Sequence, residues 1–342
     1  MRTARAWRGE DGQSGTEYLG ALLLVSAIVI VLLSASVPDA IAGGIRKAIC
    51  TIGSGTDCGE PDRGGGYADD EPYPDSGLAD REIYDAGCGD TPDDPVREGD
   101  DDAVGDEQVD KAYENLGRVY DYYHETFGYD SYDGHGAPVV GIVNVCDGGT
   151  SSYWSDDSVH FAPGAGDALD TAAHEFTHGV TANTAGLRYE CQSGALNESI
   201  SDIMAWNLDP EDPTYGEDRN GGAIRNYEYP ERFGQPMTVD DYRATPNERF
   251  GDWGGVHTNS GITNHAYYEL VVRVGREQAE QIVWRALEEH LQPDSDFEDF
   301  RTAMLESAEE LYGRGAEVDG VDAAFAAVGL DGTWDAPEQE GC

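Results

Sequence analysis

Basic residues are scarce in this sequence, and Lys47 and Lys111 are its only lysines. Of 342 residues, 21 are lysine or arginine whereas 68 are aspartate or glutamate, which gives a formal net charge of -47. Such a surface repels the phosphate backbone of DNA and RNA, so we expect no nucleic-acid partner. A negative charge of this size is typical of a solubility device, of salt tolerance, or of a store of oxygen ligands for divalent cations.

No two cysteines have the C-x-x-C spacing, which argues against a cysteine metal cluster and against a thioredoxin-like redox pair. The number of cysteines is even, and this suits disulfide bonds in an oxidising compartment. Their pairing cannot be deduced from the sequence, since Cys50 with Cys58 is the only local suggestion and each could also be a free buried thiol. The six cysteines are Cys50, Cys58, Cys88, Cys146, Cys191 and Cys342.

A long uncharged apolar run, "LGALLLVSAIVIVLLSASV", occupies residues 19–37. As a helix it is long enough to cross about 30 Å of hydrocarbon. Arg2, Arg5 and Arg8 precede it, which predicts a cytoplasmic leader and a single-pass membrane protein whose remaining residues lie outside. A cleavable secretory signal is the alternative, because the small residues before Gly43 offer a cleavage site after Ala42 that would make the protein secreted.

The residues "DGQSGTEYLGALL" resemble the N-terminus of the small Flp-type pilins. Those pilins are cut after a glycine, and their mature chains carry glutamate at the fifth position and tyrosine next. The matching positions are Gly12, Glu17 and Tyr18. This resemblance implies export and membrane anchoring through the apolar helix, and it leaves a pilin-like assembly of that segment open.

The segment that follows is rich in Gly, Pro, Asp and Glu, so residues 38–105 are predicted to form an extended acidic tether. Near Asp106 the pattern changes, because apolar residues recur on one face of a helix that ends near Gly128. A strand is predicted over 137–145 and an irregular hairpin over 151–164. The predicted apolar face of the first helix consists of Val109, Ala112, Tyr113, Leu116, Val119, Tyr120 and Tyr123.

The remaining chain has mainly helical patterns, so a lobe with strands is followed by a helical lobe and the fold class is α+β. The helices are predicted over 167–183, 195–208, 260–274, 276–291, 297–312 and 321–328. The predicted organisation is a leader over 1–18, a transmembrane helix over 19–37, the tether over 38–105, an N-terminal lobe over 106–184 and a C-terminal lobe over 185–342.

The string "HEFTH" places His174 and His178 four residues apart, on one face of a predicted helix, where both imidazoles can reach one ion. Zinc needs a third protein ligand and an open position for water. Glu198, 20 residues after His178 on the next helix, is the predicted third ligand, and Asp202 is one turn further on. Asp202 can accept the free ring N–H of a ligating histidine. Glu175 is then placed as the general base, with a solvated surface glutamate as the alternative.

The blocks "HEFTH", "GALNESISD" and "GDWGGVHTNSGITNHAYYEL" look like the thermolysin family of zinc endopeptidases, from about Tyr113 onward. The resemblance implies a two-lobed fold with zinc in the cleft and cleavage of polypeptides before an apolar residue. It also implies that Tyr189 and His257 stabilise the oxyanion and that Asp252 orients His257. Fixed donors aimed at a growing negative charge lower a barrier by about 3 kcal/mol each in comparable sites.

The resemblance further implies residues that bind the substrate. Arg225, in "GGAIRNY", matches the family's arginine for a substrate carbonyl, and a surface ion pair is the alternative. Ser151, Ser152 and Trp154 occupy the edge strand that pairs with the substrate backbone, although serines replace the family's asparagine-alanine pair.

A calcium site is also implied, because four carboxylates fall where the family gathers them. Thr214 replaces one expected carboxylate, and four acidic residues in so acidic a chain can simply be solvated. The candidate ligands are Asp170, Asp209, Asp212 and Glu217.

Two alternatives to a zinc endopeptidase fit this sequence less well. A catalytically silent surface or pilus-associated binding protein on the same fold requires a broken catalytic set, whereas this sequence keeps every residue of it. A zinc aminopeptidase is disfavoured because the sequence has no Gly-x-Met-Glu-Asn string to bind a free substrate amine.

Overall fold

The computed structural model of the chain describes residues 80–146, 152–166, 168–217 and 222–342. Its first lobe contains a five-stranded sheet with the order β2-β1-β3-β5-β4. β1 with β3 and β3 with β5 are parallel, and the two outer pairs are antiparallel. β4 is therefore an edge strand. The strands are β1 (Arg81–Asp85), β2 (Arg97–Glu98), β3 (Val139–Val143), β4 (Tyr153–Ser155) and β5 (Ser158–His160).

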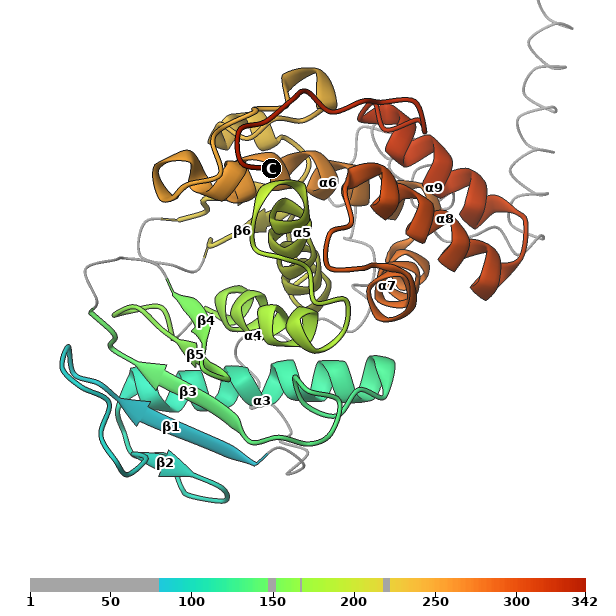
Figure 1. Cartoon of the computed structure of the whole chain (residues 1–342). Helices are drawn as coiled ribbons and strands as arrows, with labels where there is room; N and C mark the ends of the chain where they lie inside the picture. Colours follow the sequence, from blue (N-terminus) through green and yellow to red (C-terminus); the bar gives the residue numbers. More distant parts are fainter. Residues whose placement is uncertain (1–79, 147–151, 167, 218–221) are drawn as a thin grey trace, which may run out of the picture. The chain divides into compact units, whose positions relative to one another are not determined.

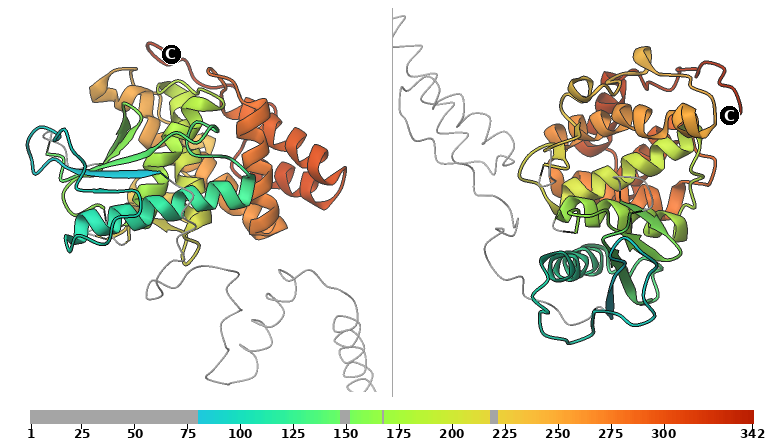
Figure 2. Two further views of the ribbon diagram at one scale, coloured as in Figure 1. Left: turned by 90° about the horizontal axis from the view of Figure 1, so that it is seen from below. Right: turned by 90° about the vertical axis from the view of Figure 1, so that its left-hand side faces the viewer.

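The helix α3 (Glu107–Phe127) packs against this sheet, as Figures 1 and 2 show. Asp106 caps its first turn by accepting hydrogen bonds from two backbone N–H groups, and Gly128 ends it in the left-handed conformation with φ 69°. The predicted apolar face is confirmed, because all seven of its residues are buried.

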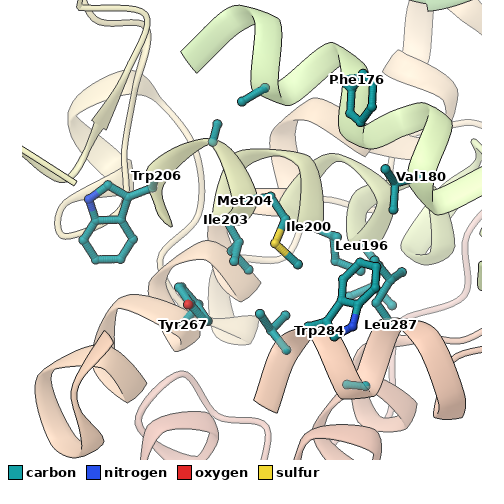
Figure 3. Close-up of a cluster of buried hydrophobic side chains, with 14 of the residues drawn as sticks. Phe176, Val180, Leu196, Ile200, Ile203, Met204, Trp206, Tyr267, Trp284 and Leu287 are labelled. Carbon is teal, nitrogen blue, oxygen red and sulfur yellow. The ribbon is translucent and has the colours of Figure 1, made fainter. Parts of the chain in front are cut away.

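The second lobe is built from helices that pack around the buried helix α5. α5 is apolar or small around most of its circumference, and it lies between α4 and α6. Figure 3 shows the resulting core, where Val180 of α4 lies near Leu196 and Ile200 of α5, while the ring of Phe176 packs against Tyr123 of α3. Each such side chain stabilises the fold by about 1.5–3 kcal/mol. The helices are α4 (Leu169–Asn183), α5 (Cys191–Leu208), α6 (Asp252–Val274), α7 (Arg276–Arg285), α8 (Phe297–Tyr312) and α9 (Ala316–Ala327).

Short elements connect these helices. A π-helical turn (Ala286–His290) extends α7, so the helix predicted over 276–291 is divided in two. A two-stranded sheet and three 3₁₀ turns fill the chain between α5 and α6: β6 (Thr214–Tyr215), β7 (Arg225–Asn226), η1 (Pro230–Phe233), η2 (Val239–Asp241) and η3 (Arg249–Gly251).

The boundary of the predicted tether differs from the structure. β1 and β2 both lie within residues 38–105, and Ile83 of β1 is fully buried. The five-residue strand "REIYD" is too short to stand out from its polar surroundings, and it becomes a strand by pairing with β3, which follows more than 50 residues later. The first lobe therefore begins earlier than predicted.

Two disulfide bonds join parts of the described chain. Cys88–Cys146 connects the segments that follow β1 and β3, and Cys191–Cys342 connects the first residue of α5 to residue 342. The suggested pair Cys50–Cys58 lies outside the described residues, as do the apolar run 19–37 and the pilin-like positions. Within the described ranges, no helix is both long enough and apolar enough to span a membrane.

Candidate functional site

α4 and α5 bring three metal-binding side chains together. The Nε2 atoms of His174 and His178 lie 3.2 Å apart, and each is 3.5 Å from a carboxylate oxygen of Glu198. Ligands of a tetrahedral zinc at 2.0–2.1 Å are separated from one another by about 3.3 Å. The spacing and the chemistry of the three donors therefore fit zinc, and they leave the fourth position for water or substrate. Within the described part of the chain, this is the sole group of at least three such side chains whose ligand atoms lie within 4.8 Å of one another.

Partners of the second ring nitrogens orient both histidines. Nδ1 of His174 lies 2.9 Å from Asp202, and Nδ1 of His178 lies 2.7 Å from Oδ1 of Asn197. Asn197 is itself oriented, since its amide donates to the backbone oxygen of Leu187 at 3.1 Å. In the neutral imidazole, each partner favours the proton on Nδ1, so Nε2 is the nitrogen that can ligate a metal. Sequence reasoning placed Asp202 but missed Asn197, although Asn197 directly precedes Glu198.

The protonation of the two histidines differs in the absence of a metal. Burial lowers the pKa of His174, but the carboxylates of Asp202 and Glu198 outweigh burial and raise that pKa to about 10. Burial dominates at His178 and lowers its pKa to about 4. A metal ion must therefore displace a proton from His174 when it binds, because only a deprotonated nitrogen can ligate it.

Glu175 lies beside the three ligands rather than among them. Its Oε2 atom is 3.9 Å from Nε2 of His178, and the residue is 6 % exposed, so the alternative of a solvated surface glutamate is wrong. Burial raises the pKa of Glu175 to about 7. A carboxylate with this pKa can both accept and release a proton near neutral pH.

Tyr189 and His257 both lie beside the carboxylate of Glu198. The hydroxyl of Tyr189 hydrogen bonds to Glu198 and lies 3.0 Å from Nε2 of His257. Asp252 fixes His257 twice, because it lies 2.6 Å from Nδ1 and accepts from the backbone N–H at 3.0 Å. Both site residues remain partly exposed, Tyr189 to 42 %, so a substrate can reach them.

The charges around this pair keep both of them able to donate hydrogen bonds. Burial and the carboxylate of Glu198 raise the pKa of Tyr189, so its hydroxyl keeps its proton. Glu198 and the hydrogen bond to Asp252 also raise the pKa of His257. The arrangement can therefore present two donors to a growing negative charge.

Arg225 belongs to the interior of the site. It is 9 % exposed, it forms an ion pair with Asp202, and its second nitrogen lies 3.2 Å from Glu198. The alternative of a surface ion pair is therefore wrong. The role of Arg225 toward a substrate carbonyl stays a prediction.

The edge strand β4 is present, but its predicted side chains face inward. Ser152 is buried and accepts from the backbone N–H of Ala162 at 3.3 Å, while Ser151 lies outside the described residues. Trp154 packs against Gly179 of α4, where an added Cβ would lie 2.5 Å from the indole ring. Trp154 thus holds β4 against the metal-binding helix, and the outer edge of β4 offers backbone groups.

The four predicted calcium ligands do not form a closed group. Asp170 accepts from the backbone N–H groups of Gly216 and Thr171, whereas Asp212 and Glu217 both contact Thr214. Burial and the neighbouring Asp170 raise the pKa of Glu217 to about 7. Asp209 follows the last residue of α5. Calcium therefore stays a prediction.

The fold and the site together define a two-lobed metallopeptidase, in which a His-Glu-x-x-His helix meets a glutamate of the next helix. Residues 83–182 match the thermolysin metallopeptidase catalytic domain, and residues 185–330 match the thermolysin metallopeptidase alpha-helical domain. The chain belongs to the thermolysin metallopeptidase family. The resemblance stated from the sequence is thus confirmed for the catalytic lobes.

Several curated proteins are similar to this chain. It is 42 % identical over 228 residues to "Bacillolysin" of Bacillus amyloliquefaciens and to "Neutral protease NprE" of Bacillus pumilus, covering 64 % of this chain and 44 % and 76 % of those proteins. It is 42 % identical over 214 residues to "Extracellular elastase" of Staphylococcus epidermidis, covering 58 % of this chain and 41 % of the elastase. The chain thus spans less than half the length of two of these three relatives.

A solved structure supports the same assignment. The "Precursor of Protealysin, Metalloproteinase from Serratia proteamaculans" superimposes with a TM-score of 0.67 at 31 % identity, over 74 % of this chain and 88 % of that chain. The predicted α+β, two-lobed architecture is therefore confirmed for the lobes.

The prediction of a single-pass membrane protein is corrected by these findings. A relative is named as an extracellular elastase, and the described residues include no helix that could span a membrane. The run 19–37, on which the prediction rested, lies outside the described residues. Neither membrane anchoring nor a pilin-like assembly has support in the structure.

Proposed function

We propose that this protein is a zinc-dependent endopeptidase that acts outside the cytoplasm. The observation that carries the proposal is the cluster of His174, His178 and Glu198, in which the two Nε2 atoms lie 3.2 Å apart and each lies 3.5 Å from an oxygen of the Glu198 carboxylate. Glu175 lies 3.9 Å from His178, and Tyr189 and His257 both lie beside Glu198. A metal held by three protein ligands with an open fourth position is typical of catalytic rather than structural zinc.

A bound zinc would polarise the scissile carbonyl and acidify a water molecule. Glu175 takes a proton from that water as its oxygen forms a bond to the carbonyl carbon. Glu175 then passes the proton to the amine nitrogen as the C–N bond breaks, so the carboxylate is regenerated.

Tyr189 and His257 stabilise the oxyanion that develops during this addition. Their donor atoms lie 3.0 Å apart, so both can reach one oxygen. Arg225 binds the substrate carbonyl beyond the scissile bond, and the free edge of β4 pairs with the substrate backbone. Preference for an apolar residue after the scissile bond follows from the family resemblance.

The disulfides and the names of the relatives support a location outside the cytoplasm. Cys88–Cys146 and Cys191–Cys342 persist in oxidising compartments and are rare in reducing ones. The proposed substrates are therefore polypeptides outside the cytoplasm.

The test is cleavage of an N-terminally blocked peptide that has an apolar residue after the scissile bond. The wild type is compared with Glu175→Gln, each with and without a zinc chelator, and bound zinc is measured in both. We expect cleavage by the zinc-loaded wild type alone and a loss of about 10²–10⁴-fold in Glu175→Gln, with zinc retained. A zinc-loaded wild type that cuts no blocked peptide would favour a silent binding protein, and one that cuts only unblocked peptides would favour an aminopeptidase.

A further inference from the structure

Residues 331–342, which we call the strap, lie beyond the part of the chain that matches the thermolysin family. The dark-red trace in Figure 1 runs from the neighbourhood of α9 to α5. Near its start, Trp334 stacks on Phe297 and contacts the ring of Tyr242. The backbone N–H groups of Gly332 and Trp334 also donate to Glu298. The strap is therefore docked on α8 before it approaches the site.

The side-chain amide of Gln339 in the strap contacts the segment before His257, where it hydrogen bonds to three residues between 242 and 254. Its Nε2 atom donates to the backbone oxygens of Thr245 and Gly254, both at 2.7 Å. Its Oε1 atom accepts from the hydroxyl of Tyr242 at 2.5 Å. Both amide hydrogens and the carbonyl of one side chain thus fix three points of residues 242–254.

The end of the strap is fastened to the start of α5. Cys342 forms the disulfide with Cys191, and Asn247 donates from its backbone to Glu340 at 2.9 Å and from its side chain to Gly341 at 3.1 Å. The same side-chain amide donates to Glu190 at 2.7 Å. The strap therefore joins two backbone segments that are distant in sequence.

These two segments carry the two groups of the proposed oxyanion site. Tyr189 immediately precedes Glu190 and Cys191, and His257 follows the turn over residues 252–255, in which every residue has a positive φ. Gly254 of this turn lies close to both α5 and the strap. A Cβ added to Gly254 would lie 2.9 Å from the Cα of Cys191 and 2.9 Å from the Nε2 of Gln339. The turn is thus enclosed by the start of α5 and by the strap.

We propose that the strap positions His257 against Tyr189, with Gln339 as a positioning residue and the Cys191–Cys342 disulfide as its fastening. The proposal rests on the proposed function, because the pair must act together on one oxygen. Such donors work only when they are held within about 0.5 Å of the productive geometry. The turn before His257 departs from right-handed helical geometry at Trp253, Gly254 and Gly255, and the strap restrains it from outside through Gln339.

The test compares Gln339→Ala and Cys342→Ser with the wild type, using the full chain loaded with zinc and the blocked peptide. We expect kcat to fall about 10-fold with KM unchanged, because the transition state needs the aligned pair more than the substrate does. The control is the double variant Cys88→Ser/Cys146→Ser, which removes the disulfide of the first lobe and should keep the wild-type kcat. Unchanged kcat in Gln339→Ala would overturn the proposal.

A second arm separates positioning from general stability. In a His257→Ala background, Gln339→Ala should cause no further loss, because the residue that the strap positions is already gone. A loss of the same size in both backgrounds would overturn the proposal, since it would show that the strap acts elsewhere.

Hydrogen exchange gives a readout that does not need activity. The backbone N–H groups of Trp253, Gly254 and His257 donate hydrogen bonds to Glu248, Pro246 and Asp252, respectively. We expect them to exchange about 10-fold faster in Gln339→Ala and at the wild-type rate in the control. If the wild type cleaves no peptide, the proposed function fails and exchange alone decides: equal rates in Gln339→Ala and wild type would then refute the strap.

Discussion

Replacing Asp202 by asparagine tests whether charge, and not only hydrogen bonding, prepares the metal site. Asp202 is fully buried, and three donors approach its carboxylate: His174 at 2.9 Å, Asn264 at 2.8 Å and the guanidinium of Arg225. An amide has the same shape but accepts at only one end. Asn264 can compensate by turning its own amide, because its Oδ1 atom is buried and has no hydrogen-bond partner among the described residues. Asp202→Asn therefore removes one negative charge while most of the hydrogen bonds can be kept.

The expected losses of stability and of zinc affinity depend on the interactions that Arg225 and His174 keep after the substitution. Removing one partner of a buried ion pair costs about 3–5 kcal/mol, and the low end applies here because Arg225 keeps Glu198 at 3.2 Å. The metal-free protein should therefore lose about 3 kcal/mol of its free energy of unfolding. Loss of a carboxylate that supports a ligating histidine weakens metal binding by about 10–100-fold, or about 1.4–2.7 kcal/mol.

Zinc affinity is measured by competition with a chromophoric chelator, and stability by urea unfolding of the metal-free protein. The matched control is Asp322→Asn, because the Asp322 side chain is 61 % exposed and its carboxylate pairs with Arg301. This control should change neither quantity measurably. If Asp202→Asn binds zinc within twofold of the wild type, the argument that charge prepares His174 is refuted.

Three further predictions concern protons and backbone geometry. Zinc uptake near pH 8 should release protons, because the pKa of His174 is raised to about 10 and metal binding displaces its proton; a titration of the metal-free protein in weak buffer measures this. Glu217, whose pKa is raised to about 7, binds a proton in the folded state that the unfolded chain has released, so stability should fall as pH rises from about 4.5 to 7; urea unfolding of Glu217→Gln should show a shallower fall. Gly254→Ala should destabilise the protein by about 1–3 kcal/mol, because φ is +86° and the new Cβ would lie 2.9 Å from Cys191. A thermal melt beside Gly234→Ala, where φ is +78° and no atom of the described residues lies within 4 Å of the new Cβ, separates the cost of the contact from the cost of the positive φ.

The sequence predicts those parts of the site whose geometry is local. Two histidines four apart on a helix must share a face, and this relation is independent of the remaining fold. Glu198 and Asp202 are likewise one turn apart on a single helix, so identifying one places the other. The apolar face of α3 is predictable for the same reason, because its period is that of the helix itself.

Other parts of the site depend on tertiary pairing, which one sequence does not reveal. Asn264 reaches Asp202 across 62 positions, and Gln339 reaches Thr245 across 94. In the sequence, an asparagine on a helix or a glutamine in a loop looks the same whether or not it meets such a partner. β1 was missed for a related reason, since a five-residue strand in a polar segment exists only by pairing with β3.

The charges of the site explain why a divalent cation suits it. Glu198 and Asp202 are buried together, and burial by itself would raise both carboxyl pKa values. The pKa of Glu198 is nevertheless held low by His257, His174 and Arg225, and that of Asp202 by Arg225 and His174. Without a metal, the protein compensates in part by raising the pKa of His174 so that the ring carries a proton. A zinc ion would replace that single positive charge with two and return His174 to the neutral form that ligates metals. The positive charge of the zinc ion would also lower the pKa of Glu175. The proposed base would therefore be ionised in the metal-bound protein before a substrate arrives.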